Sequence, residues 1–394
     1  CAIPSCIERH SYHSTEQTVK IKKLDHRVTT WNAVYVGDKV PWDPDYRGGQ
    51  LLEEAAYAQN WKEVHAVEEM GWDYIWLGGG HFSTQGSMDP QPLMLSAAIA
   101  GRTQRIKIGT SIHRPILKQP GDQASPRALP HERYAFDQLM REDPLQVAEQ
   151  VSIVDQLSQG RFIYGAGGRT RGNDAKREHF FEFLEVLKQL WTEDHFSGFE
   201  GKYYQYPAFY ESYLNIPKPV QKPYPPMLLP VDSQESFEPM GTHGYRIAIG
   251  GGTSPHNLRG YAVLKEDVQR YRKAWKDAGH PGDPTTVVRM PTLVAETKAE
   301  AQRLTENLRR LARRCYAGRA GIGSTDAGSA SPETAADANL FGTPEEVVES
   351  IHFLRENFSS DEIMFEVNWT ASVPRDVVMN TMRLITDKVI PQFK

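Results

Sequence analysis

The sequence predicts an α/β protein whose main domain is a (β/α)8 TIM barrel with insertions and an N-terminal extension. About eight short apolar runs alternate along the chain with stretches that have the periodicity of amphipathic helices. The length of 394 residues suits a single barrel with insertions. Glycines and polar residues directly follow several of the apolar runs, where barrel enzymes place their active sites. A doubly wound open sheet is the alternative that the same alternation allows.

The expected strands are short and rich in β-branched or aromatic residues. They lie at residues 28–36, 74–77, 106–112, 161–166, 227–231, 245–249, 287–295 and 363–367. Helical patterns follow at 51–70, 92–102, 144–157, 177–191, 234–242, 257–278, 298–313 and 377–390. Asp143 and Pro144 suit an N-cap and the first helical position, and Gly160 suits the turn beyond that helix. Thr343 and Glu346 have the spacing of a capping box, which opens one further helix.

Three segments interrupt this alternation. Residues 1–27 are polar, so we expect an N-terminal extension there and a single barrel domain over 28–394. Residues 117–142 are rich in proline and charge and are expected to form an insertion. Residues 317–339 are rich in Gly, Ala and Ser, and we expect them to form a mobile lid over the barrel mouth, because long loops in compact domains are frequently functional.

Composition excludes several classes of protein. The chain has 45 Lys and Arg against 50 Asp and Glu, a net charge of −5, which argues against a nucleic acid or an anionic membrane as partner. No apolar run approaches the roughly 18 residues that a membrane span needs. The 3 cysteines give no disulfide framework, so we expect a reducing, cytoplasmic location. No Cys or His cluster has zinc-binding spacing, and we expect no metal.

Histidines follow two of the expected strands. His81 comes after Gly78, Gly79 and Gly80, and a run of glycines lets a ligand or another backbone approach closely. This position favours a functional role for His81 at the barrel mouth. His113 follows the next strand and is a weaker candidate, since a lone histidine is more often structural.

Two turns have the character of anion sites. The strand over 161–166 leads into a glycine-rich turn that contains Arg169, and Arg177 stands at the start of the next helix. Asp232, Ser233 and Ser236 follow the strand over 227–231, where a helix N-terminus presents free N–H groups. A phosphate suits both turns. The alternatives are a solvated basic turn and a simple N-cap.

Six segments resemble those of the bacterial-luciferase-like flavin-dependent monooxygenases. They are 69–76 (EMGWDYIW), 81–82 (HF), 106–110 (IKIGT), 155–162 (DQLSQGRF), 199–204 (FEGKYY) and 342–346 (GTPEE). Their order and spacing also match, so the resemblance extends over nearly all the chain after about residue 50. It implies a (β/α)8 barrel that binds reduced FMN or, in one branch of the family, a deazaflavin.

The resemblance also implies roles for individual residues. The bend at Ser111 and Ile112 resembles a non-proline cis peptide that packs against the flavin ring. Arg177 matches an arginine that binds the FMN phosphate, and Arg169 resembles a second one with a shift of one residue. The turn residues that match a phosphate-holding segment are Asp232, Ser233 and Ser236. Luciferase itself has two adjacent histidines where this chain has Gly80 and a single His81.

From the resemblance we expect a monooxygenase in which reduced FMN and O2 oxygenate a small organic substrate through a flavin hydroperoxide. His81 is the expected hydrogen-bond donor or proton shuttle. The chain has no nicotinamide-binding motif, so a partner flavin reductase is implied, and homodimers are common in the family. The alternatives are a deazaflavin-dependent hydride-transfer oxidoreductase and a non-catalytic flavin-binding subunit of the same fold.

Overall fold

The computed structural model describes only part of the chain. The described residues are 23–27, 50–78, 90–115, 142–167, 174–231, 233–250, 261–306, 340–358, 360–367 and 373–393. Among them, no helix is both long enough and apolar enough to cross a membrane. The expected insertion over 117–142 lies outside the described residues except for Glu142, and the expected lid over 317–339 lies outside them altogether.

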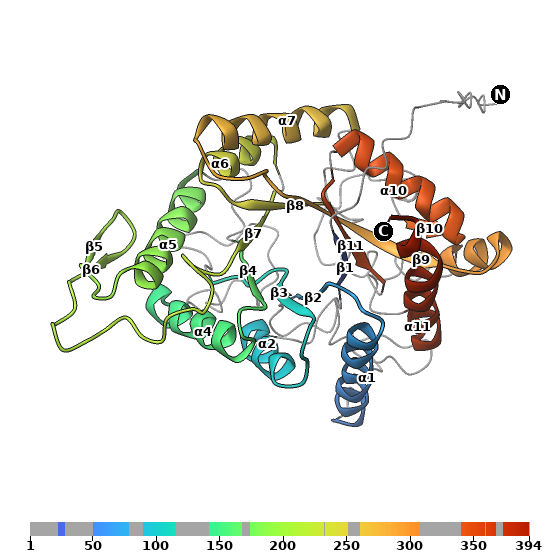
Figure 1. Ribbon diagram of the computed structural model, residues 1–394, viewed down its shortest axis with the longest axis horizontal. Coiled ribbons are helices and arrows are strands. Elements are labelled where there is room, and N and C mark those ends of the chain that lie inside the picture. Colours follow the sequence, from blue (N-terminus) through green and yellow to red (C-terminus); the bar gives the residue numbers. More distant parts are fainter. Residues whose placement is uncertain are drawn as a thin grey trace, which may run out of the picture.

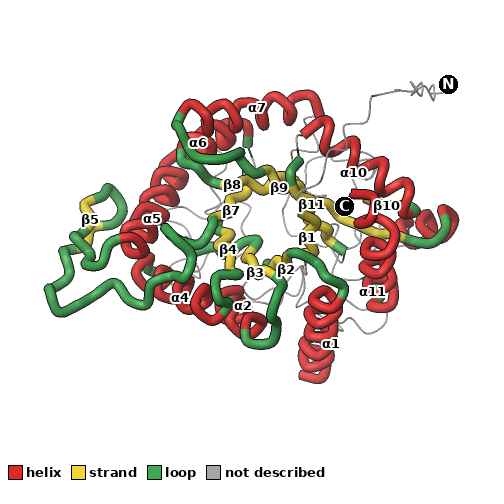
Figure 2. Tube along the Cα trace, viewed as in Figure 1, coloured by secondary structure: helices red, strands yellow, loops and turns green. Residues whose placement is uncertain are grey.

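Parallel strands form a closed ring, which confirms the predicted barrel (Figure 2). The sheet has 9 strands, and β10 (Leu340–Gly342) lies beside β9 as an outer strand. The other strands pair in the order β9-β11-β1-β2-β3-β4-β7-β8, and a further pairing of β8 with β9 closes the ring. Their bounds are β1 Lys23–Arg27, β2 Tyr74–Leu77, β3 Lys107–Thr110, β4 Phe162–Gly165, β7 Met227–Pro230, β8 Arg246–Gly250, β9 Thr286–Val294 and β11 Glu362–Glu366.

Helices lie outside the ring of strands (Figure 1). They are α1 Gln50–Glu69, α2 Pro92–Ala100, α4 Pro144–Leu157, α5 Asp174–Thr192, α6 Phe237–Thr242, α7 Tyr261–Asp277, α10 Pro344–Phe358 and α11 Arg375–Leu384. A short 3-10 turn, Gln234–Ser236, precedes α6, and a π-turn, Ile385–Val389, and a 3-10 turn, Ile390–Phe393, follow α11. Residues 298–306 are also helical. A protruding arm, residues 199–226, contains the hairpin of β5 (Phe199–Glu200) and β6 (Gln205–Tyr206).

The predicted helix caps are present. The Asp143 side chain accepts a hydrogen bond from the Leu145 amide at 2.9 Å, with Pro144 in the first turn of α4. Thr343 and Glu346 form the capping box, because the Thr343 amide donates to Glu346 Oε2 at 3.0 Å and the Glu346 amide donates to Thr343 Oγ1 at 3.4 Å. Local sequence therefore determines where these two helices begin.

The first strand differs from the expectation. β1 occupies Lys23–Arg27, inside the segment that we assigned to an N-terminal extension, so the barrel begins earlier than residue 28. Residues 28–36, where we expected the first strand, lie outside the described residues. The sequence of β1 is KLDHR, which has little apolar character, and the strand is held by parallel pairing with β11 on one side and β2 on the other. Backbone pairing thus outweighs side-chain propensity here.

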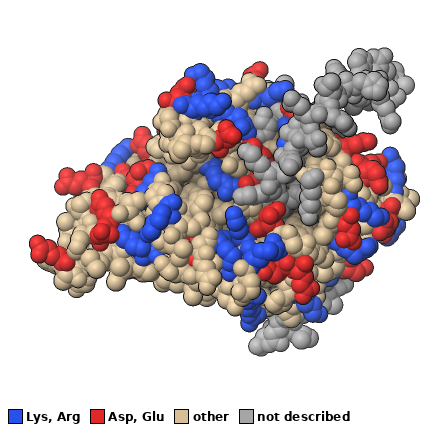
Figure 3. All heavy atoms as spheres, viewed as in Figure 1, with Lys and Arg blue, Asp and Glu red and all other residues tan. Residues whose placement is uncertain are grey.

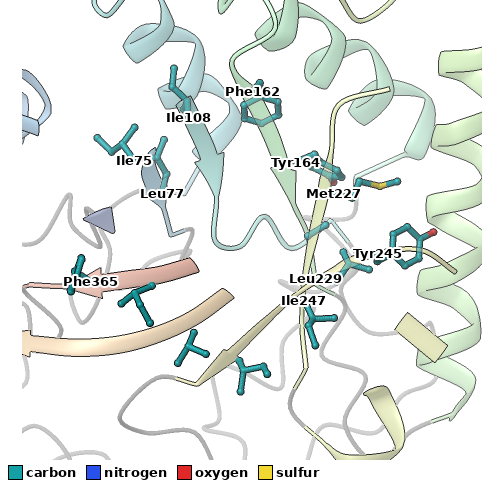
Figure 4. Packing of buried hydrophobic residues seen from close by; sticks show 14 of the residues in the cluster. Ile75, Leu77, Ile108, Phe162, Tyr164, Met227, Leu229, Tyr245, Ile247 and Phe365 are labelled. Carbon is teal, nitrogen blue, oxygen red and sulfur yellow. The ribbon is translucent and has the colours of Figure 1, made fainter. Parts of the chain in front are cut away.

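Two apolar layers stabilise the barrel. The inner layer consists of residues from five strands and from no helix, and so it fills the ring: Tyr74 and Trp76 from β2, Ile163 from β4, Leu228 from β7, Val287 from β9 and Met364 from β11. Gly109 on β3 is required here, because a Cβ atom at this position would lie 2.2 Å from the Trp76 ring. The outer layer packs the other strand faces against the helices, and Figure 4 shows part of it around Ile108, Phe162 and Tyr164.

A buried carboxylate between α1 and α11 makes stability depend on pH. Glu63 is 1% exposed and contacts Arg375, which also donates to Asn60 Oδ1 at 3.2 Å. Burial outweighs the attraction of Arg375 and raises the pKa of Glu63 from its usual value near 4.5 to about 7. The folded state therefore binds this proton more tightly than the unfolded chain does. The protonated Glu63 therefore stabilises the folded state fully below pH 4.5, and this contribution is lost as the pH rises toward 7.

We expect Glu63→Gln to remove this dependence on pH. In the wild type, the Glu63 contribution to the free energy of unfolding should fall by about 3 kcal/mol between pH 4.5 and 7.5. Urea denaturation at several pH values measures the difference between wild type and variant. Glu349→Gln, an exposed change on α10, is the matched control and should leave the wild-type curve unaltered. If the free energy of unfolding depends on pH in the same way in wild type and Glu63→Gln, Glu63 is not the source of the pH dependence.

Candidate functional site at the C-terminal ends of the strands

The ends of β3 and β4 are held together by a side chain and a close backbone approach. Thr110 Oγ1 donates to the Gly165 carbonyl at 2.7 Å and accepts from the Gly165 amide at 2.9 Å. A Cβ atom on Gly165 would lie 1.6 Å from the Thr110 carbonyl oxygen, so only glycine allows this contact. The segment that follows Thr110 is therefore fixed at the mouth of the barrel, on the side where barrel enzymes bind their ligands.

The peptide bond between Ser111 and Ile112 is cis, which confirms the expected non-proline cis peptide at this position. Ser111 is 6% exposed, and its Oγ lies 3.9 Å from Met364 Sδ of the inner layer, so the side chain faces the interior of the barrel. The Ile112 side chain packs against Gly167, where a Cβ atom would come within 2.4 Å of Ile112 Cδ1. Both residues are thus placed by close packing at the inner rim of the barrel.

Arg177 lies in the first turn of α5 and presents unused hydrogen-bond donors. Its Nη1 donates to Asp174 Oδ1 at 3.0 Å, while its side chain is only 14% exposed. The Nε and Nη2 atoms are buried and have no hydrogen-bond partner in the described part of the chain. Buried donors of a guanidinium group that lack a partner are costly, so this geometry suits an anion.

Ser233 and Ser236 form a buried hydroxyl pair in the turn after β7. They are 8% and 4% exposed, and their Oγ atoms lie 2.9 Å apart. Because β4 and β7 are paired in the sheet, this turn and the N-terminal turn of α5 follow neighbouring strands at the same end of the barrel. The structure therefore brings two of the expected anion-binding elements, Arg177 and the serine pair, to adjacent positions in the fold.

Three of the expected site residues lie outside the described residues. They are His81, Arg169 and Asp232, and their assignments stay predictions. Each follows the C-terminal end of a described strand: β2 ends at Leu77, β4 at Gly165 and β7 at Pro230.

The weaker histidine candidate, His113, is engaged in a buried network on the outer side of the strands. Its Nε2 lies 2.6 Å from Glu142 Oε2, and its Nδ1 lies 3.0 Å from the Tyr164 hydroxyl. Because Nε2 faces a carboxylate, we assign the proton to Nε2, and Nδ1 then accepts the Tyr164 hydrogen. Burial raises the pKa of Tyr164 well above its usual range, and the negative charge of Glu142 adds to this effect. Tyr164 packs edge-on against Trp191 of α5, so this network stabilises the wall of the barrel.

An ion pair inside the barrel mouth was not singled out by the sequence reasoning. Arg289 Nε on β9 lies 3.5 Å from Glu366 Oε2 on β11. The available signal was a charged residue within each apolar run, since Arg289 interrupts TVVRMPTLV and Glu366 ends EIMFE. A charge that is enclosed by apolar strand residues needs a partner or a function.

The fold is a parallel (β/α)8 barrel, and the candidate site residues that the structure describes lie at the C-terminal ends of its strands, where barrel enzymes have their active sites. A sequence model of the luciferase-like monooxygenase family matches residues 42–125 and 135–359. The chain therefore belongs to the luciferase-like monooxygenase family, as its sequence motifs indicated.

Relatives in this family use different cofactors. The chain is 22% identical over 353 residues to the FMNH(2)-dependent dimethylsulfone monooxygenase of Pseudomonas putida, which covers 80% of this chain and 86% of that protein. It is 28% identical over 154 residues to the F420-dependent glucose-6-phosphate dehydrogenase of Amycolatopsis mediterranei, but this match spans only 35% of this chain and 39% of that protein. The fold is similar to that of the monooxygenase RslO1 from Streptomyces bottropensis, with a TM-score of 0.71, 20% identity, and coverage of 94% and 100% of the two chains.

Proposed function

We propose that the protein is an FMN-dependent monooxygenase that uses reduced FMN and O2 to oxygenate a small organic substrate. The observation that carries this proposal is Arg177, whose buried Nε and Nη2 lack hydrogen-bond partners among the described residues. Arg177 lies at the start of the helix after β4, and the Ser233–Ser236 pair follows β7, the strand paired with β4. This donor set suits the terminal phosphate of FMN. The relative that matches over most of the chain is named for its dependence on FMNH(2).

Different residues would bind the phosphate, contact the flavin ring and transfer protons. Arg177, Arg169 and the turn with Asp232, Ser233 and Ser236 would hold the phosphate, and Ser111 and Ile112 would contact the flavin ring. Reduced FMN supplies the chemistry with O2 when it is bound, and the protein positions it and excludes water. His81 would hold or deliver a proton at the reacting atoms.

We further propose that a separate flavin reductase supplies the reduced cofactor, because the sequence has no nicotinamide-binding motif of its own. The 3 cysteines, which form no disulfide framework, favour the cytoplasm as the place of this reaction. A deazaflavin-dependent hydride-transfer oxidoreductase is the second candidate, and the match to an F420-dependent dehydrogenase favours it. A non-catalytic flavin-binding subunit is the third, since the chain has a single histidine, His81, where luciferase has two.

Cofactor binding and reaction with air test these proposals together. The protein is titrated with FMN and with F420 under anaerobic conditions, and the FMN complex is then reduced and mixed with air in a stopped-flow spectrometer. We expect tighter binding of FMN and a transient absorbance that differs from both oxidised and reduced FMN. Preference for F420 would establish the second candidate, and direct return to oxidised FMN without a transient would favour the third.

We also propose that the protein is a homodimer, joined by the face that contains α2, α4 and the arm. Most of the exposed large hydrophobic residues among those described lie here: Met94 on α2, Ile153 and Leu157 on α4, and Tyr210, Tyr213, Leu214, Ile216 and Val220 on the arm. The arm is tied to α4, because Gln156 donates to the Lys218 carbonyl at 2.7 Å. In Figure 3, residues other than Lys, Arg, Asp and Glu cover most of the lower left edge, over this region. An apolar patch of this kind marks a protein interface.

We expect the double change Ile153→Glu and Leu157→Glu to convert the dimer to a monomer, because it places four charges across a two-fold interface. Size-exclusion chromatography with light scattering measures the mass. Phe353→Glu is the matched control, since Phe353 is 43% exposed, close to the 45% of Ile153, and lies on α10 at the other side of the barrel. A double variant that keeps the mass of the wild type would place the interface elsewhere.

A further inference from the structure

The ion pair of Arg289 and Glu366 lies in the inner mouth of the barrel. On β9, Val287 belongs to the inner layer, so Arg289, two residues further on, points to the same side. On β11, Met364 belongs to the inner layer, and Glu366 likewise lies two residues beyond it. The pair thus forms the next layer toward the C-terminal ends of the strands, above the apolar filling of the barrel.

A second interior ion pair shows what a purely structural contact looks like in this barrel. Arg246 and Glu362 are the first residues of β8 and β11, at the opposite end of the ring. Arg246 Nη2 donates to Glu362 Oε2 at 2.7 Å, and these side chains are 16% and 4% exposed. This short contact closes the bottom of the barrel with a charge-assisted hydrogen bond.

The upper pair is different, because no hydrogen bond joins Arg289 to Glu366, whereas Arg246 Nη2 donates one to Glu362. The 3.5 Å contact with Glu366 Oε2 compensates the charge of Arg289, but the buried Arg289 Nε has no hydrogen-bond partner among the described residues. The Arg289 side chain is 26% exposed, against 11% for Glu366, so part of the guanidinium reaches the open mouth. A guanidinium with five donors, placed in an apolar barrel and neutralised by one carboxylate, is suited to bind an oxygen acceptor.

The ring places Arg289 across the barrel from the Ser111–Ile112 segment. In the order β9-β11-β1-β2-β3-β4-β7-β8, strand β3 lies halfway around from β9 in either direction. Under the proposed function, Ser111 and Ile112 contact the flavin ring, and the space between them and Arg289 is where the organic substrate binds. Arg289 then faces the substrate from the side opposite the flavin.

Resting on that function, we propose that Arg289, held by Glu366, binds a carbonyl or carboxylate oxygen of the organic substrate and thereby selects substrates that carry such a group. Glu366 keeps the local charge neutral, which favours a single oxygen acceptor and disfavours a multiply charged anion. Arg289 is a residue for specificity, and it takes no part in proton transfer.

Three shape-matched probes test the proposal: acetophenone, benzoate and isopropylbenzene. Calorimetric titration measures their binding to the flavin-free protein and to the FMN-loaded protein. We expect the wild type to bind at least one of the two oxygen-bearing probes about tenfold or more tightly than isopropylbenzene, and Arg289→Met to abolish this preference. Arg383→Met is the matched control, because Arg383 pairs with Glu296 at 3.4 Å on the outside of the protein, and it should keep the preference.

Two further variants separate a binding effect from a folding defect and distinguish a carbonyl from a carboxylate ligand. Arg289→Lys keeps the positive charge and should retain a reduced preference with a melting temperature near that of the wild type. Glu366→Gln removes the compensating charge and should strengthen benzoate binding relative to acetophenone. Equal binding of all three probes by the wild type, or an unchanged preference in Arg289→Met, overturns the proposal. Failure of FMN to bind contradicts the proposed function alone, since the preference is also measured without flavin.

Discussion

Arg177→Ala is expected to weaken FMN binding by roughly 10- to 100-fold and to leave riboflavin binding nearly unchanged. The reason is the loss of charge-assisted hydrogen bonds to the phosphate, which are worth roughly 1.5–3 kcal/mol. Arg177 has the donors for these bonds in place, because its Nε and Nη2 are buried and no described residue accepts a hydrogen bond from them. Fluorescence titration of FMN and of riboflavin, on wild type and variant, gives the four dissociation constants required.

Lys188→Ala provides the control for this experiment. Lys188 lies on the same helix, and its side chain is 16% exposed against 14% for Arg177, but it pairs with Glu185 and lies 4.5 Å from the centre of the Tyr245 ring. Its removal should affect neither flavin selectively. If Arg177→Ala weakens the binding of FMN and of riboflavin by the same factor, Arg177 does not contact the phosphate.

His81→Ala is expected to lower product formation by roughly 10²- to 10⁴-fold, which is the usual contribution of one general acid–base group. Flavin affinity should stay within about twofold of the wild type. The basis is the place of His81 in the sequence, four residues after the C-terminal end of β2, because barrel enzymes take their catalytic residues from the segments that follow the strands. Single-turnover oxygenation with pre-reduced FMN measures the effect without interference from the reductase.

His113 provides a structural control for the His81 variant. His113 was the other histidine candidate, but both of its ring nitrogens are engaged, with Glu142 and Tyr164, in the wall of the barrel. We therefore expect His113→Leu to lower the melting temperature, and His81→Ala to leave it close to that of the wild type. A His81→Ala variant with normal turnover and a reduced melting temperature would reverse the two assignments.

Sequence reasoning predicted the elements whose signals are local. The strands β2, β4, β7, β8, β9 and β11 are apolar runs, and they lie within about one residue of the expected ranges. The starts of α4 and α10 follow from caps that span three or four residues. The helix α5 begins at Asp174, three residues before the predicted start, because helix propensity alone does not determine the first turn.

Elements without a local signal were missed. β1 has the sequence KLDHR and becomes a strand because two neighbours offer it parallel pairing. β5 and β6 are two residues each, too short for any periodicity to appear, and β10 adds three residues to the outside of β9. These strands exist because unpaired backbone groups of another strand are available, which is a property of the folded chain.

By itself, the sequence determined the barrel class, the family, and the types of residue at the strand ends, including Arg177, Ser233 and Ser236. Patterns of apolar residues and caps act over a few positions, so they can be recognised along the chain. Only the tertiary structure decided which of these side chains have unused donors. Among the described residues, the buried Nε and Nη2 of Arg177 have no hydrogen-bond partner, and no hydrogen bond joins Arg289 to Glu366, whereas Arg246 Nη2 donates to Glu362 Oε2. Partners of this kind come from distant strands that the closure of the ring brings together.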